Sequence, residues 1–426
     1  MSSKLSTLQN AIDWLNQMDE LDRPVASQWL DDLRLVDSQS FNQKLRKFVH
    51  ERASKVSGGR PIALYVEREL AQRKGLSQFA FWQKNTKNPI TGKRALRSFG
   101  PAVKFKLLAS QRTTRPEAGS EAIVANLMTG LQRAHRKEYY LNAGPDEFRR
   151  RSIRTVFVVT DFIGTGDRAW KFLNAFWRMP TIKSWRSTGL VQFHILAYSA
   201  TAEGVAHVRS HPIQPEVHWL APCPTIRTLY TESDANRIKE VLVKYDPVDK
   251  HPIDSLGYRG QGAMLIFSHG CPNNAPRALY KADSDWIPLF VGRSNTLPIF
   301  NNQDSLEKRE RAFALLHTGR RSMVLSSAAW TGDGHERLLV LAALKSGHRF
   351  RERVAEVTGL DLSCVDAAMD SLKALGWVAA SGVLTAEGRT NLQYAGPFEL
   401  RKTGSSDAGS TNRMYYPKSL REPFKC

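Results

Sequence analysis

The feature that most constrains the fold is one buried strand that runs into a turn of small residues. The apolar run Val156–Val159 is followed by Thr160 and Asp161, and Phe162–Gly166 then leads into a helical pattern from Asp167. A small-residue turn at the carboxyl end of a parallel strand offers unpaired N–H groups and the positive end of a helix dipole to a phosphate. We expect a parallel α/β sheet, with either a phosphate site or a glycine turn kept for packing.

The segments around this motif alternate between strand and helix patterns. We predict strands at 61–66, 103–109, 156–159, 192–198, 217–220 and 263–267, and helices at 121–137, 167–178 and 202–209. Apolar strands that alternate with helices are typical of a parallel sheet covered on both faces. Residues 73–100 and 245–261 read as an excursion and a loop, respectively.

Two further regions flank this core. The first 55 residues have helical spacing, with helices predicted at 25–36 and from Ser38 or Ser40 to Leu45. Helices at 336–345, 350–358 and 362–375, followed by a hairpin at 376–384, predict a winged helix-turn-helix. We therefore expect four regions: a helical leader (1–58), an α/β domain (59–325), a winged helix (326–395) and a flexible basic tail (396–426).

Composition indicates where the protein acts and what it binds. The chain lacks an apolar run of 18 residues and the start of a signal peptide, so we expect a soluble, cytoplasmic protein without membrane contact. Its four cysteines are far apart and not paired with histidines at ligand spacing, which predicts neither a metal site nor a disulfide framework. Most of the net charge of +20 lies in the first 190 residues, which favours a nucleic-acid partner for that half.

The strand and turn resemble the signature of type I phosphoribosyltransferases, in which an acidic pair holds ribose hydroxyls and a Thr-Gly turn holds a phosphate. The resemblance implies that Asp161 is the catalytic, ribose-binding acid. It implies a ribose-phosphate site of Thr160, Asp161, Gly164, Thr165 and Gly166. Thr160 stands where the first acid is expected, and Asp167 stands beside the phosphate turn, where a carboxylate is unfavourable. Mg²⁺ is the expected cofactor if the donor carries a diphosphate.

Two other segments are candidates for the same site. Arg115, Gly119 and Ser120 form an arginine-bearing loop before a helix, which suits either a diphosphate grip or a simple helix cap. Asn273 and Asn274 follow the strand at 263–267, and their amides suit either contact with a base or ribose or an ordinary turn.

Nucleic-acid contacts are expected in two places. Arg149, Arg150, Arg151 and Arg154 form the stronger polyanion candidate, and Arg349, Arg351 and Arg353 could contact a backbone from the winged helix. The helix at 362–375 exposes Asp366 and Asp370, which makes it a poor reader of bases, so contact with a protein is nearly as plausible.

The order of parts along the chain resembles the ribosyltransferase/DNA-binding proteins encoded beside retron reverse transcriptases in bacterial antiphage systems. The shared parts are the helical leader, Gly119–Glu121, Val159–Gly166, Pro272–Asn274, Trp286–Phe290 and the winged helix. This resemblance implies an effector toxin that acts with a reverse transcriptase and its msDNA and noncoding RNA to arrest growth on infection. The alternative is a non-catalytic transcriptional regulator that senses a nucleotide or phosphorylated ribose.

Overall fold

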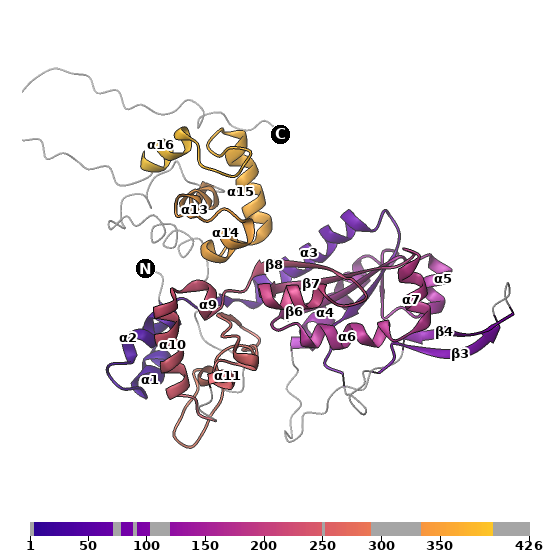
Figure 1. Cartoon of the computed structure of the whole chain (residues 1–426), viewed down its shortest axis with the longest axis horizontal. Coiled ribbons are helices and arrows are strands. Elements are labelled where there is room, and N and C mark those ends of the chain that lie inside the picture. Colours follow the sequence, from indigo (N-terminus) through magenta and orange to yellow (C-terminus); the bar gives the residue numbers. More distant parts are fainter. Residues whose placement is uncertain are drawn as a thin grey trace, which may run out of the picture. The chain divides into compact units, whose positions relative to one another are not determined.

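The computed structural model describes residues 4–70, 78–87, 92–102, 120–248, 252–290 and 334–394. These residues form two compact units (Figure 1), which we call the sheet unit (4–290) and the C-terminal unit (334–394). The strand predicted at 103–109 lies outside the described residues.

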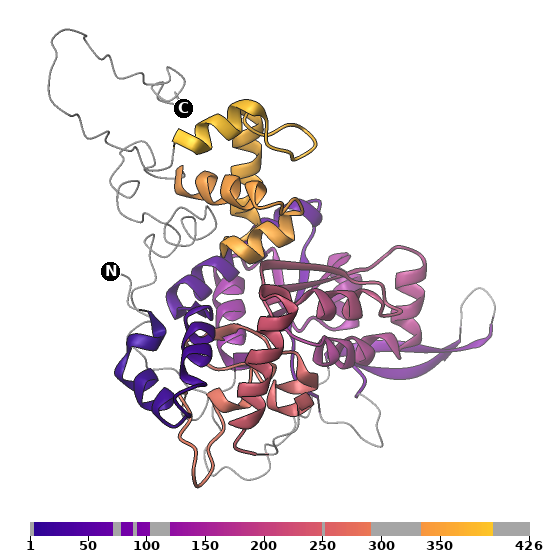
Figure 2. The ribbon, with the colours of Figure 1, turned by 60° about the vertical axis from the view of Figure 1, so that its left-hand side comes forward.

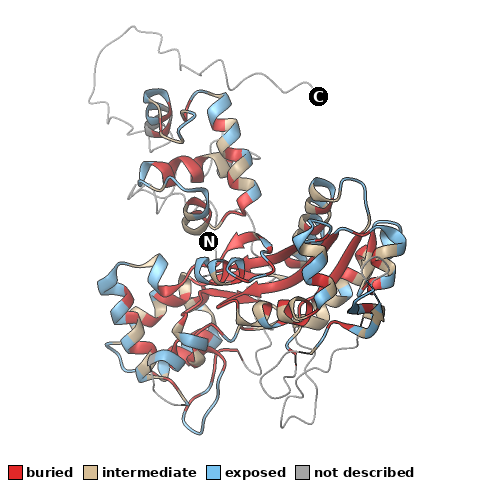
Figure 3. Ribbon diagram, turned by 45° about the vertical axis from the view of Figure 1, so that its right-hand side comes forward, coloured by how far each residue is buried: buried red, intermediate tan, exposed pale blue. Residues whose placement is uncertain are grey.

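A five-stranded parallel sheet forms the centre of the sheet unit, with the order β5-β2-β6-β7-β8. The strands of the sheet unit are β1 (Arg34–Val36), β2 (Ile62–Val66), β3 (Phe81–Lys87), β4 (Arg94–Ala102), β5 (Tyr139–Leu141), β6 (Thr155–Ile163), β7 (Gln192–Ala200), β8 (Glu216–Pro222) and β9 (Leu265–Phe267). All nine residues of β6 are buried, as a central strand with two covered faces requires (Figure 3). This confirms the predicted α/β class.

Helices cover both faces of this sheet. The helices of the sheet unit are η1 (Leu5–Thr7), α1 (Gln9–Asn16), α2 (Arg23–Asp31), α3 (Ser38–Val56), α4 (Ser120–Ala134), α5 (Pro145–Arg151), α6 (Asp167–Trp177), α7 (Pro180–Ser187), α8 (Ala202–Arg209), α9 (Ile226–Leu229), α10 (Glu232–Lys244), α11 (Pro252–Ser255), η2 (Tyr258–Gly260) and η3 (Arg277–Leu279). Apolar residues of α5–α8 pack on one face, and those of α3 and α4 pack on the other. The sheet is therefore a three-layer sandwich.

The leader is mostly helical but contains a strand that the sequence did not predict. The expected helix at 25–36 ends at Asp31, and β1 then pairs in parallel with β9. Asp37, rather than Ser38 or Ser40, caps α3 by accepting a hydrogen bond from the Ser40 amide. Trp14 and Trp29 are fully buried among residues of α10 and 264–290, so α1 and α2 share a core with the end of the sheet unit (Figure 2).

The excursion predicted at 73–100 contains an antiparallel ribbon of β3 and β4. In Figure 1 this ribbon extends away from the sheet. Within the segment expected to be a loop at 245–261, the structure has α11 and η2.

The C-terminal unit contains four helices and a short hairpin among its described residues. They are α13 (Gly334–Lys345), α14 (Arg351–Thr358), α15 (Leu362–Ala374) and α16 (Ala386–Tyr394), with a β-bridge between Val378 and Leu384. Gly359 ends α14 in the left-handed conformation, which allows the sharp turn into α15. Helices α13, α14 and α15 with this small wing confirm the predicted winged-helix arrangement, and α16 is a fourth helix that the sequence did not predict.

Buried His211 makes the stability of the sheet unit sensitive to acid. Its Nδ1 accepts from the Ile213 amide, and Nε2 contacts Asn174 Oδ1. Burial, and next the charge of His207, lower the pKa of His211 to about 4. Because the pKa in the folded state lies below the unfolded value of 6.5, neutral His211 contributes its full stabilisation only above pH 6.5. This contribution to the free energy of unfolding is lost as the pH falls towards 4.

We therefore predict that His211→Asn, which keeps an acceptor for the Ile213 amide, makes the free energy of unfolding less dependent on pH below pH 7. The wild-type free energy of unfolding should fall by about 1.2 kcal/mol more than that of the variant between pH 7 and pH 5.5. Urea unfolding followed by circular dichroism at both pH values measures this difference. Equal slopes for the two proteins would contradict the assignment.

Candidate functional site

The carboxyl ends of β2 and β6 bring two acidic side chains together. Glu67 directly follows β2, and its amide bonds to the Val159 carbonyl, which places it beside Thr160 on β6. Thr160 Oγ1 donates to Glu67 Oε2 at 2.7 Å and lies 3.2 Å from Asp161 Oδ1. The position that lacks an acid in the sequence motif is therefore served by a carboxylate from the neighbouring strand.

Arg168, in the first turn of α6, bridges the two carboxylates. Its Nε lies 2.8 Å from both oxygens of Glu67, and its Nη2 lies 3.1 Å from Asp161 Oδ1. Burial lowers the pKa of the Arg168 guanidinium, but the two carboxylates outweigh burial and raise it above its usual value. Such charge-assisted bonds fix all three side chains in one geometry.

Asp161 stays ionised in this setting. Burial raises its pKa, but His269 and Arg168, and then a hydrogen bond from Ser120, hold the pKa below its usual range. His269 Nε2 lies 3.9 Å from Asp161 Oδ2, so its effect at this distance is electrostatic rather than a hydrogen bond. The structure thus brings Ser120, at the start of α4, to the same carboxylate.

The turn Gly164–Gly166 is tightly enclosed. Gly166 has φ +83°, and a Cβ there would lie 2.8 Å from the Gly204 carbonyl oxygen, so a side chain is excluded. A Cβ on Gly164 would meet the Asn274 side chain at 2.2 Å. Asn274 therefore packs directly on the turn, whereas neighbouring Asn273 is exposed.

Asp167 at the start of α6 carries a compensated charge. Its Oδ2 lies 3.0 Å from Arg259 Nη2 and accepts from the Tyr258 hydroxyl, and its Oδ1 lies 3.3 Å from His207 Nε2. Arg259 adopts φ +57°, which is uncommon for a side chain with Cβ. The carboxylate that seemed unfavourable for an anion is thus surrounded by donors.

Several buried polar atoms beside the turn have no hydrogen-bond partner among the described residues. They are Asn274 Nδ2, Gln261 Oε1 and His269 Nε2. Gln261 Nε2 also donates to Thr201 Oγ1, which in turn donates to the Gly164 carbonyl. An orphaned buried polar atom costs about 1–3 kcal/mol, so a polar ligand at this turn would recover part of that cost.

The other predicted residues lie elsewhere or outside the described part. Arg115 and Gly119 are not among the described residues. Arg149, Arg150, Arg151 and Arg154 lie at the amino end of β6, so the nine-residue strand separates them from the turn by about 26 Å. Arg349, Arg351 and Arg353 are in the C-terminal unit, where Arg351 pairs with Asp366 and Arg353 with Glu356.

Sequence reasoning missed Glu67, Arg168 and Arg259. Glu67 was detectable as an acid directly after a buried strand, and Arg259 as a cation within the glycine-rich stretch 257–262. Arg168 lies two positions after the end of the signature at Gly166, and only the direction of its side chain identifies its role.

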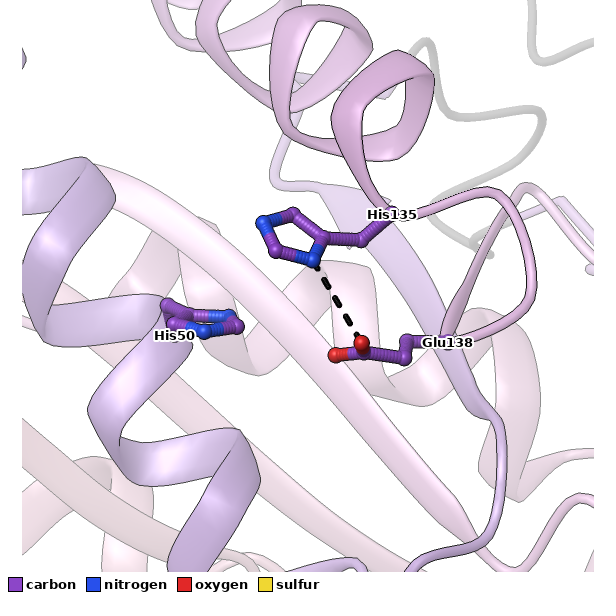
Figure 4. A group of neighbouring side chains, drawn as sticks. All are labelled: His50, His135 and Glu138. Carbon is purple, nitrogen blue, oxygen red and sulfur yellow. Dashed lines mark ion pairs between the residues drawn. The ribbon is translucent and has the colours of Figure 1, made fainter.

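Two groups of histidine and glutamate side chains within the described residues could hold a metal. One is His50, His135 and Glu138 (Figure 4), and the other is His194, Glu216 and His218. In the first group His135 Nδ1 faces Glu138 at 3.4 Å, while His50 Nδ1 is already engaged by the Tyr139 hydroxyl at 2.9 Å. Neither group contains a residue of the turn.

A parallel sheet with paired carboxylates and a glycine turn at its carboxyl edge defines the class of phosphoribosyltransferase-like α/β domains. Residues 11–291 match the family model described as PRTase-CE, and the chain belongs to this family. Residues 338–422 match the model described as wHTH-PRTase associated. No curated protein matches the chain. Among the helices that the structure describes, none is both long and apolar enough to cross a membrane.

The bridge made by Arg168 yields a stability prediction. Arg168→Met leaves two buried carboxylates facing each other, so the free energy of unfolding should fall by about 3 kcal/mol. This is the lower end of the usual range, because the Arg168 side chain is 35% exposed. Urea unfolding measures the loss.

The matched control removes all three charges. Glu67→Gln, Asp161→Asn and Arg168→Met combined should be clearly more stable than Arg168→Met alone, because no uncompensated charge then remains. A triple variant no more stable than the single variant would show that packing, rather than charge, explains the loss.

Proposed function

We propose that the carboxyl edge of β2 and β6 binds a phosphorylated ribose or nucleotide and transfers its ribosyl group. The observation that carries this proposal is the meeting of Glu67 and Asp161 with the Gly164–Gly166 turn at the start of α6. Carboxylates accept hydrogen bonds from ribose hydroxyls, and the first-turn N–H groups of α6 suit a phosphate.

The chemistry follows from these positions. Transfer at C1′ passes through an oxocarbenium-like state, which is favoured when the ribose is held rigidly and the departing anion is neutralised. Asp161, paired with Glu67, would position the ribose. Arg259 brings positive charge, and His207 a ring nitrogen, to the start of α6, where a phosphate would lie. If the donor carries a diphosphate, Glu67 and Asp161 are carboxylates that could bind Mg²⁺, which would neutralise the leaving group.

At the level of the cell, we propose a retron effector that acts with a reverse transcriptase and its msDNA and noncoding RNA, and arrests growth on phage infection. The family membership, the winged helix and the positive charge support a protein that acts beside nucleic acid. The reverse transcriptase partnership rests on the resemblance in the order of parts.

One observation favours a second candidate, a ligand sensor without catalysis. Arg168 already occupies both carboxylates, and the residues from Asp161 to Gly166 are all buried. A ligand would have to displace these bonds, and such displacement is a plausible signal to the winged helix.

The discriminating experiment expresses the chain with its cognate reverse transcriptase and noncoding RNA, and compares wild type, Asp161→Ala and a deletion of 334–394. An enzyme predicts that infection alters the wild-type nucleotide pools, and that Asp161→Ala loses both this change and phage protection. A lysate immunoblot confirms that the variants accumulate, and Asp161→Asn provides a variant of nearly unchanged shape.

Unchanged pools, with protection that depends on 334–394 but not on Asp161, would rule out the enzyme. Binding of labelled ribose 5-phosphate by the purified chain, without turnover, would then identify the sensor.

A further inference from the structure

The β3–β4 ribbon carries an unusual concentration of positive charge. Its described residues, 81–87 and 92–102, contain five cations and no acidic residue. These cations are Lys84, Lys87, Lys93, Arg94 and Arg97, and all five are exposed. Within the described part of the chain, none of them forms an ion pair with a carboxylate.

The register of the ribbon sets like charges against each other. Lys84 pairs directly with Arg97, and Lys87 with Arg94. Like charges at opposed positions destabilise a ladder, and a two-stranded ribbon is marginal by itself. Two such pairs in one short ribbon are therefore costly to the free protein, and a bound polyanion would remove that cost.

Aromatic side chains lie among these cations. Trp82 pairs with Phe99 across the ribbon on the face that also carries Lys84 and Arg97, and Trp82 is 56% exposed. Lys84 Nζ lies 5.0 Å from the centre of the Phe99 ring. A ring holds a cation without using its N–H donors, so these donors remain available to phosphate oxygens.

The base of the ribbon is fixed to the basic helix α5 and to α7. The Ser98 amide donates to Thr181 Oγ1, and Arg149 donates to the Ser98 carbonyl. Burial, and next the charge of Arg97, lower the pKa of the Arg149 guanidinium, which shows how closely the cations are grouped. Arg151 lies over Tyr140 and Lys183 over Trp177 in the same way as Lys84 lies over Phe99.

From these observations we infer that the β3–β4 ribbon, with α5 and α7 at its base, binds single-stranded nucleic acid. The cations follow the backbone, and Trp82 stacks on an unpaired base. In a duplex the bases are stacked on each other and cannot stack on Trp82, so a duplex would make only the ionic contacts between its phosphates and the cations. This surface lies at the opposite end of β6 from the ribose site, so the inference does not depend on the proposed function.

The test measures fluorescence anisotropy of a labelled 20-nucleotide oligo(dT), and of a 20-base-pair duplex, with the full chain over a range of NaCl concentrations. Lys84→Gln combined with Arg97→Gln should reduce the slope of log K against log salt by about 1.4 for oligo(dT). The control, Arg237→Gln combined with Lys281→Gln, makes the same charge change at exposed sites away from the ribbon and should leave the slope unchanged.

Trp82→Ala tests the choice of a single strand. It should weaken oligo(dT) binding about 5- to 150-fold and leave duplex binding nearly unchanged. Equal slopes for the ribbon variant and its control, or oligo(dT) binding that is insensitive to Trp82, would overturn the inference. Circular dichroism confirms that each variant is folded.

A second inference rests on a different set of atoms. His194 Nδ1, His218 Nε2 and Glu216 Oε2 form a nearly equilateral triangle with sides of 3.4, 3.3 and 3.4 Å. Ligand bonds of about 2.1 Å in a tetrahedral zinc site place neighbouring donors about 3.4 Å apart. One point therefore lies at ligand distance from all three atoms.

The sheet holds these donors in place. His194 on β7 pairs with Glu216 on β8, and His218 follows two residues later on the same face. Arg52 and Arg209 lie close to His218, and their charges would weaken the site without blocking it.

We infer that His194, His218 and Glu216 bind a zinc-like divalent cation with one position open to solvent. The half-exposed Glu216 side chain marks the open side. The test dialyses untagged full-length protein against Co²⁺, then records its visible absorption and its metal content by mass spectrometry.

Glu216→Gln combined with His218→Ala should lose the bound equivalent. The matched control, Glu138→Gln combined with His135→Ala, changes the same residue types in the other group (Figure 4) and should retain it. A wild-type protein that retains no cobalt, or a loss confined to the control, would overturn the assignment.

Discussion

The arrangement of the proposed ribose site depends on one buried ionic contact, the bridge from Arg168 to Glu67 and Asp161. The two carboxylates come from neighbouring parallel strands, and without a cation between them their repulsion would separate the ends of β2 and β6. Because Arg168 lies in the first turn of α6, the bridge also fixes the start of that helix against the sheet. The turn Gly164–Gly166 is thus held from both ends.

The sequence predicted the part of this site that is contiguous in the chain. A buried strand, an acid and a glycine turn before a helix have a local signature, and β6 and α6 follow it closely. Glu67 and Arg259 come from distant segments, and their place at the site depends on strand order and on the path of 257–262. Such contacts follow from tertiary packing, which local hydrophobic periodicity does not predict.

The strands of the fold likewise divide into those that the local sequence predicted and those that it did not. Long apolar strands were predicted at the right places, because burial on both faces leaves a continuous signal. The strand predicted at 192–198 is β7 at 192–200, and the one predicted at 156–159 is β6 at 155–163. β1 has only three residues and is a strand because β9 pairs with it. The β3–β4 ribbon is polar along most of its length, so hydrophobic alternation could not reveal it.

Helix α6 joins the two functional ends of the sheet unit. Its first turn carries Arg168 at the proposed ribose site. Near its last turn the Ala175 carbonyl accepts from the Ala80 amide, next to the first residue of β3. Phe172 and Phe176 are fully buried, so the helix can move only with its core. A shift of the ribbon on binding a strand would therefore reach Arg168 as a movement of the whole helix. The contact most sensitive to such a movement is the bridge between the two carboxylates, because its bonds depend on the position of a single guanidinium.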